Sequence, residues 1–352
     1  MEVVAGKPLR VQSLAQAGLA NVPSQFIQPP ETRPGSWGET PDSRIPVIDL
    51  FLFDPQHSDD VRRNLRQYCS EWGAFQVRNH GVPQRLLDDM RRTGLSFFND
   101  CPMSERSKYF CDPNSAASEG YGSRMLVKDD SVLDWRDYFD HHSLPLSRRN
   151  PTRWPDFPPN YREVVTEYSD QMNSLAQKLL GLMSKSLGLS SSCIEKAIEE
   201  VYQNITISYY PPCPQPELTL GLQAHSDIGA ITLLIQDDVG GLQVLKDGKW
   251  INVQPLSDAI VVILADQTEI ITNGKYRSAE HRAITNANRA RLSVATFHEP
   301  AKTRKISPAA ELLNNNSSLP RYREVVYGEY VSSWYTKGPE GKRNVDALLL
   351  VH

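Results

Sequence analysis

From Ile205 to Pro300 the sequence consists of short apolar runs separated by turn signals, and this pattern constrains the fold more than any other feature. The clearest part is GLQVLKDGKWINV, in which Asp247-Gly248 separates two strand-like runs and predicts a type I′ hairpin. Further strands are expected in AIVVILAD, RSAEHRAITN and RLSVATFHEP. Closely spaced short strands of this kind predict a β-sandwich or barrel in the second half of the chain.

The first half has a different texture and predicts helices that pack outside this core. The segments SDDVRRNLRQYCSEWG and PQRLLDDMRRTGLSFFN have helical spacing, and a long helix is expected to end at Gly188. Short strands are expected at RIPVIDL and AFQVRNHG, loop at 113–160, and a last helix at YREVVYGEYVSSWYTKG. The predicted organisation is an extension at 1–44, a mainly helical region at 45–200 that packs on the core, the core at 201–302, and a C-terminal helix and tail at 303–352 that cover the mouth of the site.

Composition excludes several classes of protein. Over 352 residues the formal net charge is -4, which offers no basic surface for nucleic acid. No apolar run approaches the roughly 20 residues of a membrane-spanning helix, and the start of the chain lacks a signal-peptide core. The cysteines are odd in number and contain no C-x-x-C pair, so a reducing, cytoplasmic location is expected. We expect a monomer whose partners are small molecules.

The stretch GLQAHSDIGAITLLIQ places His225 and Asp227 just before a strand that is expected to be buried. Period-two alternation puts both side chains on one face of an extended chain. A hydrogen-bonded pair at a strand end would explain these two residues alone. His281, on another expected strand, adds a third candidate, and two imidazoles with one carboxylate are the ligands of non-haem Fe(II) oxygenases. Zinc is the competing metal, although its catalytic sites usually carry four or five ligands.

Arg291, in ARLSVATF, stands on an otherwise apolar expected strand, and Ser293 follows on the same face. A buried arginine needs an anionic partner. Because no carboxylate within that strand can serve, we expect the carboxylate of a bound ligand, with the Ser293 hydroxyl as a second donor. The alternative is an arginine at a strand edge that pairs with a surface acid.

Taken together, these segments resemble those of the plant 2-oxoglutarate- and Fe(II)-dependent dioxygenases. The resemblance covers nearly the whole chain, through IPVIDL, WGAFQVRNHGV, EGYGS, LDWRDY, YYPPCPQPELTLGL, GLQVLKDGKWINV, TNGKYRSAEHRAITN and RLSVATFHEP. It implies a mainly β, α+β fold whose core is a double-stranded β-helix, or jelly roll, flanked by helices. It also implies a dioxygenase that hydroxylates or desaturates its substrate and releases succinate and CO2.

The resemblance gives roles to individual residues. The Fe(II) ligands and catalytic centre that it implies are His225, Asp227 and His281. The residues that it implies for the distal carboxylate of 2-oxoglutarate are Arg291, Ser293 and Tyr210. O2 is then the second co-substrate, and ascorbate the reductant that rescues oxidised iron. Ser208 stands where the family usually has Asn, and Ala265 where it usually has Gly, so one contact to 2-oxoglutarate is expected to be weaker.

Jasmonate hydroxylases of this family hold an anionic substrate through arginines, one just before the tyrosine pair and two on the final helix. The matching residues here are Thr206, Val331 and Tyr335, so all three charges are missing. The substrate pocket is therefore expected to lack arginines. Because burying an unpaired carboxylate costs at least several kcal/mol, jasmonate is not the expected substrate.

In anthocyanidin-synthase-like members, an aromatic loop residue and a Phe-x-Glu after the arginine strand contact the flavonoid. Tyr138, Phe297 and Glu299 match these positions, and Asp140 replaces an aromatic residue. We expect a small, neutral phenolic or flavonoid-like plant metabolite, with Asp140 favouring a substrate hydroxyl as hydrogen-bond donor. Ordinary core packing would also explain Tyr138 and Phe297.

Three other functions stay open. One is the hydroxylation of an acidic hormone, either jasmonate or salicylate. Another is a catalytically silent jelly-roll protein that binds a small molecule, which the intact ligand set and Arg291 argue against. The third is a zinc hydrolase, which Arg291 and the lack of a fourth ligand disfavour. Metal analysis and 2-oxoglutarate-dependent succinate release separate an oxygenase from the last two.

Overall fold

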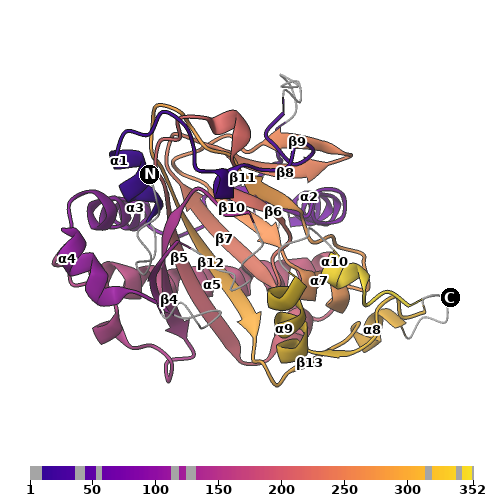
Figure 1. The fold of residues 1–352 in the computed structure, drawn as a ribbon. Helices are drawn as coiled ribbons and strands as arrows, with labels where there is room; N and C mark the ends of the chain where they lie inside the picture. The colour runs from indigo at the N-terminus through magenta and orange to yellow at the C-terminus, as the bar shows by residue number, and fades with distance from the viewer. Residues whose placement is uncertain are drawn as a thin grey trace.

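Two β-sheets form the core of the molecule, and helices cover the outside of the larger one (Figure 1). The computed structural model describes residues 10–35, 44–52, 58–111, 119–123, 132–313, 319–337 and 343–350. The large sheet has eight strands in the order β1-β2-β10-β7-β12-β5-β4-β3, and the small sheet has four in the order β6-β11-β8-β9. This is the jelly-roll core flanked by helices that the sequence predicts.

The strands of the large sheet are β1 (Val47–Asp49), β2 (Ala74–Arg78), β3 (Gly120–Gly122), β4 (Asp137–Leu144), β5 (Val201–Tyr210), β7 (Ile231–Gln236), β10 (Ile260–Leu264) and β12 (Arg291–Pro300). The strands of the small sheet are β6 (Leu222–His225), β8 (Leu242–Lys246), β9 (Lys249–Asn252) and β11 (His281–Ala283). A separate two-stranded ribbon pairs β13 (Lys305–Ile306) with β14 (Val325–Val326). Only β1 and β2 are parallel neighbours among the described strands; the other pairs are antiparallel.

The helices lie mainly on one side of the large sheet and at the two ends of the molecule (Figure 1). They are α1 (Val11–Gln16), α2 (Ser58–Glu71), α3 (Gln84–Asn99), α4 (Met103–Arg106), α5 (Tyr161–Ser186), α6 (Cys193–Ile198), α7 (Asp266–Ile271), α8 (Ala310–Leu313), α9 (Tyr327–Lys337) and α10 (Arg343–Asp346). Short 3-10 turns occur at Ser24–Phe26, Leu50–Leu52, Ser107–Tyr109, Pro151–Arg153 and Pro216–Leu218. None of the described helices is long and apolar enough to span a membrane.

The outer face of the large sheet packs against α3 and α5, which together bury the main hydrophobic core. Gly94 on α3 shows how close this contact is. A Cβ atom at Gly94 would lie 3.0 Å from Ile207 Cγ2 on β5 and 3.1 Å from Leu292 Cδ1 on β12. The missing side chain therefore lets the helix approach the sheet closely. The opposite, inner face of the same strands forms the site.

Several sequence predictions are confirmed at the level of single residues. Asp247 and Gly248 have φ values of 51° and 76°, as a type I′ turn between β8 and β9 requires. Gly73 and Gly188 follow α2 and α5 with φ values of 66° and 77°, the left-handed conformation that ends many helices. All five cysteines are free thiols, as the lack of a pairing pattern indicates.

The prediction of loop at 113–160 is wrong where it covers β4, which lies inside the large sheet beside β5. Its sequence, DYFDHHSL, is too polar to suggest a buried strand. The polar groups are tolerated because they are satisfied: the His141 ring contacts the Ile205 carbonyl oxygen at 2.8 Å and the Tyr161 hydroxyl at 2.9 Å. Alternate side chains of β4 face the helices and the site.

The C-terminal part also differs from the expectation. The last helix was predicted to begin near residue 322, but α9 begins at Tyr327 because Val325–Val326 pairs with β13 instead. The short helix α7 directly follows β10 and was not predicted.

The large sheet contains β1 to β4 as well as strands after residue 200, so it crosses the boundary expected between a helical region and the core.

Residues 10–35, here called the N-terminal strap, run along the outside of the core (Figure 1). The first two N–H groups of α1, from Val11 and Gln12, both donate to the carboxylate of Asp137 at 2.9 Å. A carboxylate at this place satisfies N–H groups that the helix itself leaves free. The strap is thereby attached to the first residue of β4.

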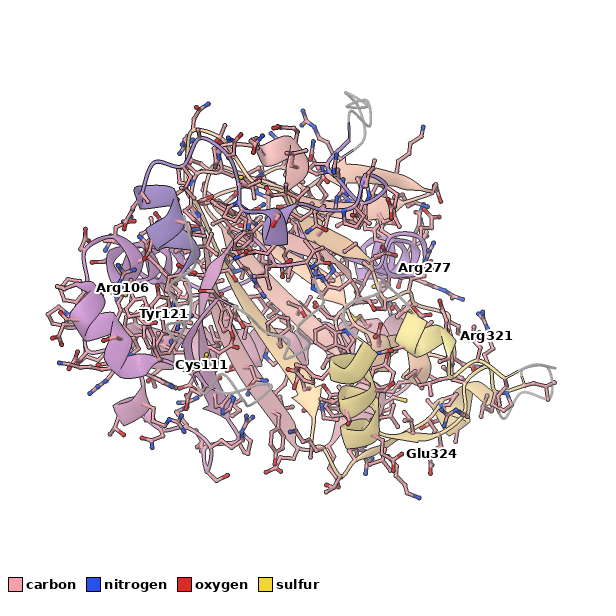
Figure 2. The ribbon with its side chains drawn as sticks, in the orientation of Figure 1. Arg106, Cys111, Tyr121, Arg277, Arg321 and Glu324 are labelled. Atoms are coloured by element: carbon pink, nitrogen blue, oxygen red, sulfur yellow. The ribbon has the colours of Figure 1, made fainter. Side chains whose placement is uncertain are left out.

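The strap also joins the edge of the large sheet to the small sheet. Arg10 lies over the ring of Tyr121 on the edge strand β3, with its guanidinium carbon 4.7 Å from the ring centroid. Arg106 of α4 lies near the same ring, at 5.8 Å (Figure 2). At the other end, Nη1 of Arg282 on β11 donates to the Thr32 carbonyl oxygen at 3.2 Å.

Candidate active site

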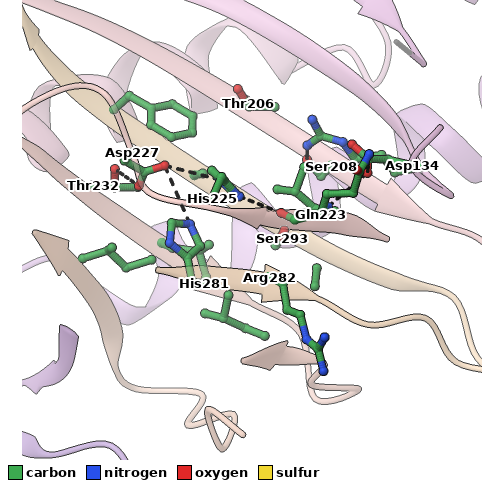
Figure 3. A pocket seen from close by; sticks show the side chains of 18 of the residues that line it. Asp134, Thr206, Ser208, Gln223, His225, Asp227, Thr232, His281, Arg282 and Ser293 are labelled. Carbon is green, nitrogen blue, oxygen red and sulfur yellow. Dashed lines mark hydrogen bonds and ion pairs between the residues drawn. The ribbon is translucent and has the colours of Figure 1, made fainter. Parts of the chain in front are cut away.

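The two sheets enclose a cavity of about 160 Å³, which Figure 3 shows from close by. Its floor is the inner face of the large sheet, where β4, β5, β12 and β7 present alternate side chains. Strands β6 and β11 of the small sheet form another wall, and α9 adds two aromatic residues. The predicted metal and co-substrate residues all line this cavity: His225, Asp227, His281, Arg291, Ser293, Tyr210 and Ser208.

The sheet pairing brings the three metal-ligand candidates together. Strand β6 ends at His225, β11 begins at His281, and the two residues are partners in the antiparallel pair. Oδ1 of Asp227 lies 3.5 Å from Nε2 of His225 and 3.7 Å from Nε2 of His281. One ligand atom from each residue lies within 4.8 Å of the others, so one metal ion could contact all three.

Hydrogen bonds from the far side of each imidazole orient the two rings. Nδ1 of His225 donates to the carbonyl oxygen of Gln223 at 2.8 Å, and Nδ1 of His281 donates to that of Ala279 at 3.0 Å. A carbonyl oxygen can only accept, so the proton of each neutral ring sits on Nδ1. The lone pair of each Nε2 therefore faces Asp227, which is the arrangement a metal requires.

The protonation states of Asp227 and His281 suit metal binding. Burial raises the pKa of Asp227, but His281, His225 and a hydrogen bond from Thr232 lower it to about 2, so the carboxylate is charged at neutral pH. Burial lowers the pKa of His281 to about 4, with His225 adding to the effect, so this ring is neutral. Burial also opposes the charge on His225, yet the adjoining Asp227 raises its pKa above the usual value.

The donor set fits Fe(II). Two imidazole nitrogens and one carboxylate oxygen occupy one side of a metal and leave the other positions open to the cavity. Within the residues that the structure describes, no further His, Cys, Asp or Glu joins the cluster. A structural zinc site normally has a fourth protein ligand, so the cluster matches an open catalytic centre better than a closed one.

Thr232 on β7 controls which oxygen of Asp227 is available. Its hydroxyl donates to Oδ2 at 2.6 Å, and Oδ1 is left facing the imidazoles (Figure 3). Thr232→Val keeps the shape but removes this donor, so we expect iron affinity to fall by about 10–100-fold. Equilibrium iron titration measures the change, and Thr166→Val on α5, whose hydroxyl bonds only within its helix, is the control. Equal iron affinity in both variants would contradict a positioning role for Thr232.

Arg291 is buried at the start of β12, yet the partners of its guanidinium are neutral. Nη1 donates to Ser293 Oγ at 3.3 Å, and Nη2 donates to Gln236 Oε1 at 3.0 Å. Its Nε is buried and has no partner among the described residues. A buried guanidinium with one free donor and no carboxylate among its hydrogen-bond partners fits a ligand carboxylate. The alternative of a strand-edge arginine is disfavoured, because only 2% of Arg291 is exposed.

This end of the cavity is electropositive. The Arg291 guanidinium carbon lies 4.8 Å from the ring centroid of Tyr210. Burial raises the pKa of Tyr210, but the charges of Arg291 and Arg136 outweigh that effect and lower it below the usual value. Ser208 accepts a hydrogen bond from Nη1 of Arg136 at 3.1 Å. Two guanidinium groups therefore flank the hydroxyl groups of Tyr210 and Ser208.

Arg136 is the main correction to the sequence analysis, which expected a substrate pocket without arginines. It is 3% exposed, lines the cavity, and lies over the Tyr138 ring with its guanidinium carbon 5.4 Å from the centroid. The sequence did contain an indication of this, because Arg136 is two residues before Tyr138 and four before Asp140. On an extended segment these three side chains lie on the same face. Because this stretch was expected to be loop, the alternation of faces was not applied to Arg136.

Most of the predicted substrate residues line the cavity: Asp140, Thr206, Phe297, Glu299 and Tyr335. Tyr138 is not among the lining residues that the structure describes; it is buried, with its hydroxyl 4.0 Å from Cys111 Sγ. The Thr206 hydroxyl donates to the Asp140 carboxylate. Burial raises the pKa of Asp140 to about 6 and that of Glu299 to about 7, so this part of the cavity holds two partly protonated carboxyl groups.

Sequence analysis missed further lining residues. Asn204 precedes Thr206 by two positions on β5, so period-two alternation could have found it. Trp334 adjoins Tyr335 on α9 and lines the cavity with it. Asp134 carried no signal of its own: it accepts the Gln223 N–H at 3.0 Å and so links the segment before β4 to the strand that ends at His225.

Comparison with known families matches both halves of the chain. Residues 202–300 match the 2OG-Fe(II) oxygenase superfamily. Residues 45–160 match the family described as the N-terminal region of the non-haem dioxygenase in morphine synthesis. The first region contains the candidate iron and 2-oxoglutarate residues, and the second contains β1 to β4.

The chain is also similar to characterised plant proteins over most of its length. It is 40% identical to Jasmonate-induced oxygenase 1 of Arabidopsis thaliana over 96% of this chain and 86% of that protein. It is 37% identical to Oxoglutarate-dependent flavonoid 7-O-demethylase 1 of Ocimum basilicum, over 96% and 90%. Among solved structures, it matches that of JOX2 in complex with 2OG, Fe and JA with a TM-score of 0.90 and 37% identity, covering 98% of this chain and 99% of that one.

Proposed function

Because this chain belongs to the 2OG-Fe(II) oxygenase superfamily, we propose that it hydroxylates or desaturates a small, neutral phenolic or flavonoid-like plant metabolite. The reaction class is that of the family: a dioxygenase that consumes 2-oxoglutarate and O2 and uses Fe(II). The proposal is carried by one observation, the cluster of His225, Asp227 and His281 in a cavity that also contains the buried Arg291.

In this proposal His225, Asp227 and His281 hold the iron. Bound Fe(II) supplies the oxidising chemistry, in which decarboxylation of 2-oxoglutarate to succinate and CO2 is coupled to oxidation of a substrate C–H bond. The protein residues position the groups that would bind the iron. The carbonyl groups behind the two rings fix their tautomers, and Thr232 fixes the carboxylate, so the ligands are pre-arranged before a metal arrives.

The distal carboxylate of 2-oxoglutarate is proposed to bind at Arg291 and Ser293. These residues lie opposite Tyr210 and Ser208 respectively in the pairing of β12 with β5. The four side chains therefore form two neighbouring cross-strand pairs on the cavity floor, and each offers at least one hydrogen-bond donor. A rigid sheet holds such donors more precisely than a loop, which favours a single orientation of the co-substrate.

Two features support a neutral organic substrate. Thr206 and Tyr335 line the cavity at positions where a cationic side chain would be needed to hold a carboxylate. The remaining floor combines the apolar ring of Phe297 with the acidic side chains of Asp140 and Glu299. A carboxylate placed beside these groups would meet like charge wherever they are ionised, whereas a phenolic hydroxyl could donate to either of them.

A second candidate is the hydroxylation of an acidic hormone, and Arg136 is the observation that favours it. Its guanidinium lines the cavity and could pair with a substrate carboxylate that reached it. The similarity to JOX2, whose structure was solved in complex with 2OG, Fe and JA, points the same way. Against it, Arg136 lies at the electropositive end beside Ser208 and Tyr210, where 2-oxoglutarate is proposed to bind.

A side-by-side turnover assay separates the two candidates. Purified protein with Fe(II), ascorbate and 2-oxoglutarate is incubated with jasmonate, salicylate and a flavanone, and products are read by mass spectrometry. We expect the flavanone to be converted and jasmonate to be ignored, because burying an unpaired carboxylate costs at least several kcal/mol. Jasmonate conversion at a rate equal to or above that of the flavanone would favour the acidic-hormone candidate.

The same preparation tests whether the protein is a catalytically silent binder. Succinate release that depends on 2-oxoglutarate should disappear when a chelator removes the metal and should return with Fe(II) but not with Zn²⁺. Iron binding without any succinate release, with or without organic substrate, would leave a binding protein as the better explanation. Ascorbate is expected to prolong turnover, which a time course with and without it measures.

A further inference from the structure

The register of the large sheet places three hydrogen-bond acceptors along one diagonal of the cavity floor. Asp140 on β4 lies opposite Thr206 on β5, and Asn204 is two residues from Thr206 on the same face. Asn204 in turn lies opposite Phe297 on β12, and Glu299 is two residues further along. Asp140, Asn204 and Glu299 are thus diagonal neighbours on adjacent strands, within reach of one ligand.

Burial shows that these side chains face the cavity. Along β12 the odd-numbered residues from 295 to 299 are partly exposed, while their neighbours at 294, 296 and 298 are buried. Asp140 and Asn204 are partly exposed in the same way on their own strands. Inside a large sheet covered by helices, such exposure arises because the side chains line an internal space. Asp140, Asn204 and Glu299 therefore each expose part of their side chain to the cavity, although Oδ1 of Asn204 is itself buried and reaches a ligand only when the amide group turns.

The acceptors are only partly satisfied by the protein. The Asn204 amide donates from Nδ2 to Glu299 Oε2 at 3.3 Å, but its Oδ1 is buried and has no partner among the described residues. Asp140 accepts from the Thr206 hydroxyl. A buried acceptor without a donor costs about 1–3 kcal/mol, and so a ligand that supplies the donor would be favoured at this place.

Most donors of the lining arginines bond to neighbouring protein groups, whereas Nε of Arg291 and Nε1 of Trp334 are buried without a partner among the described residues. Arg291 donates to Ser293 and Gln236, and Arg136 donates to Ser208 on the neighbouring part of the floor. The third lining arginine, on β11, donates to Gln243 and to the N-terminal strap. The cavity is therefore divided into an electropositive part that suits a dicarboxylate and a part dominated by acceptors.

We propose that Asp140, Asn204 and Glu299 form an acceptor row that selects substrates carrying hydrogen-bond donors, namely a phenolic hydroxyl or a protonated amine, and rejects carboxylates. Thr206 holds the Asp140 carboxylate in place, and Tyr335 from α9 closes the cavity above the row. This inference rests on the proposed function, because it takes the cavity as the site of the organic substrate. It differs in adding a cationic class and in naming the residues that discriminate.

Binding to the complete enzyme tests the proposal without turnover. The protein is loaded with Fe(II) and 2-oxoglutarate, kept free of oxygen, and titrated calorimetrically with two matched pairs of probes. The first pair is naringenin and its fully O-methylated ether, which has lost the donors. The second pair is tyramine and 3-(4-hydroxyphenyl)propanoate, which share a phenol but differ in charge. We expect the donor-rich or cationic member to bind at least about tenfold more tightly within a pair.

Two variants show which side chains cause the preference for one probe over the other. Asp140→Asn and Glu299→Gln keep the shape of each side chain but remove its charge, so each should reduce the preference for tyramine over the propanoate by about tenfold. Glu324→Gln is the control, because Glu324 lies at the surface beside the C-terminal segment and pairs with Lys305 (Figure 2). Thermal melting shows which variants are folded, and the ranking of probes by the unchanged protein stands if a variant fails to fold.

Each outcome decides the matter. A preference in the naringenin pair alone identifies a phenol as the donor, and a preference in the tyramine pair alone identifies an amine. Absence of both preferences, or a preference that both variants retain in full, overturns the acceptor row. A protein that binds iron and releases succinate but ranks the probes the other way keeps the proposed reaction class and loses this inference together with the preference for a neutral substrate.

Discussion

Replacement of His281 by alanine should abolish turnover and iron binding while leaving the fold intact. The ring is proposed to be one of three metal ligands, and it lies on a pair of strands whose other contacts do not depend on it. A metal centre contributes several kcal/mol to the chemical step, so we expect activity to fall at least about a thousandfold. Iron per chain, measured by elemental analysis after desalting, should fall in parallel. His225→Ala and Asp227→Ala should behave in the same way.

His80→Ala is the matched control for this experiment. His80 is also a buried histidine, and its Nδ1 accepts the N–H of Val82 at 3.1 Å, but it lies outside the cavity. We expect this variant to lose thermal stability and keep its iron. An active His281→Ala protein with a full complement of iron would show that the assignment of the three ligands is wrong.

Arg291→Lys should raise the Michaelis constant for 2-oxoglutarate by at least about tenfold, with a smaller effect on that of the organic substrate. Lysine keeps the charge but loses the planar fork that can bind a carboxylate with two parallel hydrogen bonds. One charge-assisted hydrogen bond contributes about 1.5–3 kcal/mol, which corresponds to a factor of about 10–150. Steady-state kinetics with each substrate varied in turn measures both constants.

Arg289→Lys is the control for Arg291→Lys, since it makes the same exchange two residues away. Arg289 is exposed and pairs with Asp238 at 2.7 Å, a surface interaction worth little. We expect its kinetic constants to match those of the unchanged protein. If Arg291→Lys altered only the constant of the organic substrate, Arg291 would belong to the substrate part of the cavity.

The metal cluster could be predicted from the sequence because it depends on strand geometry that leaves local marks. His225 and Asp227 precede a continuous apolar run, and His281 begins a short strand between polar segments. Once both are extended, the pairing of β6 with β11 needs only the correct register to bring the rings together. The charge on Arg291 within an apolar strand was an equally local signal. These features were predicted for this reason.

The substrate part of the site was harder to predict because β4 does not look like a buried strand. Its cavity-facing side chains include the polar Asp140 and His142, and its outward His141 is satisfied by partners far away in sequence. Polar residues on both faces remove the alternation of apolar and polar residues on which strand prediction depends. Arg136 was overlooked because it directly precedes β4, and Asn204 because the strand pattern was read only from Ile205 onward. Asp140 and Glu299, which the sequence predicts as substrate residues, both line the cavity, although the sequence did not show that they share one diagonal.

The N-terminal strap bonds to residues far along the chain, so it cannot fold onto the core until those residues have been synthesised. Val11 must wait for Asp137, which is 126 positions later, and Thr32 must wait for Arg282, 250 positions later. At about 5–20 residues per second, these delays are about 6–25 s and 13–50 s. The strap is therefore synthesised before both of these partners and can dock completely only after them. The strap contains many Pro, Gly and polar residues. This composition suits a segment that stays undocked during synthesis, because a more hydrophobic segment would form non-native contacts before its native partners exist.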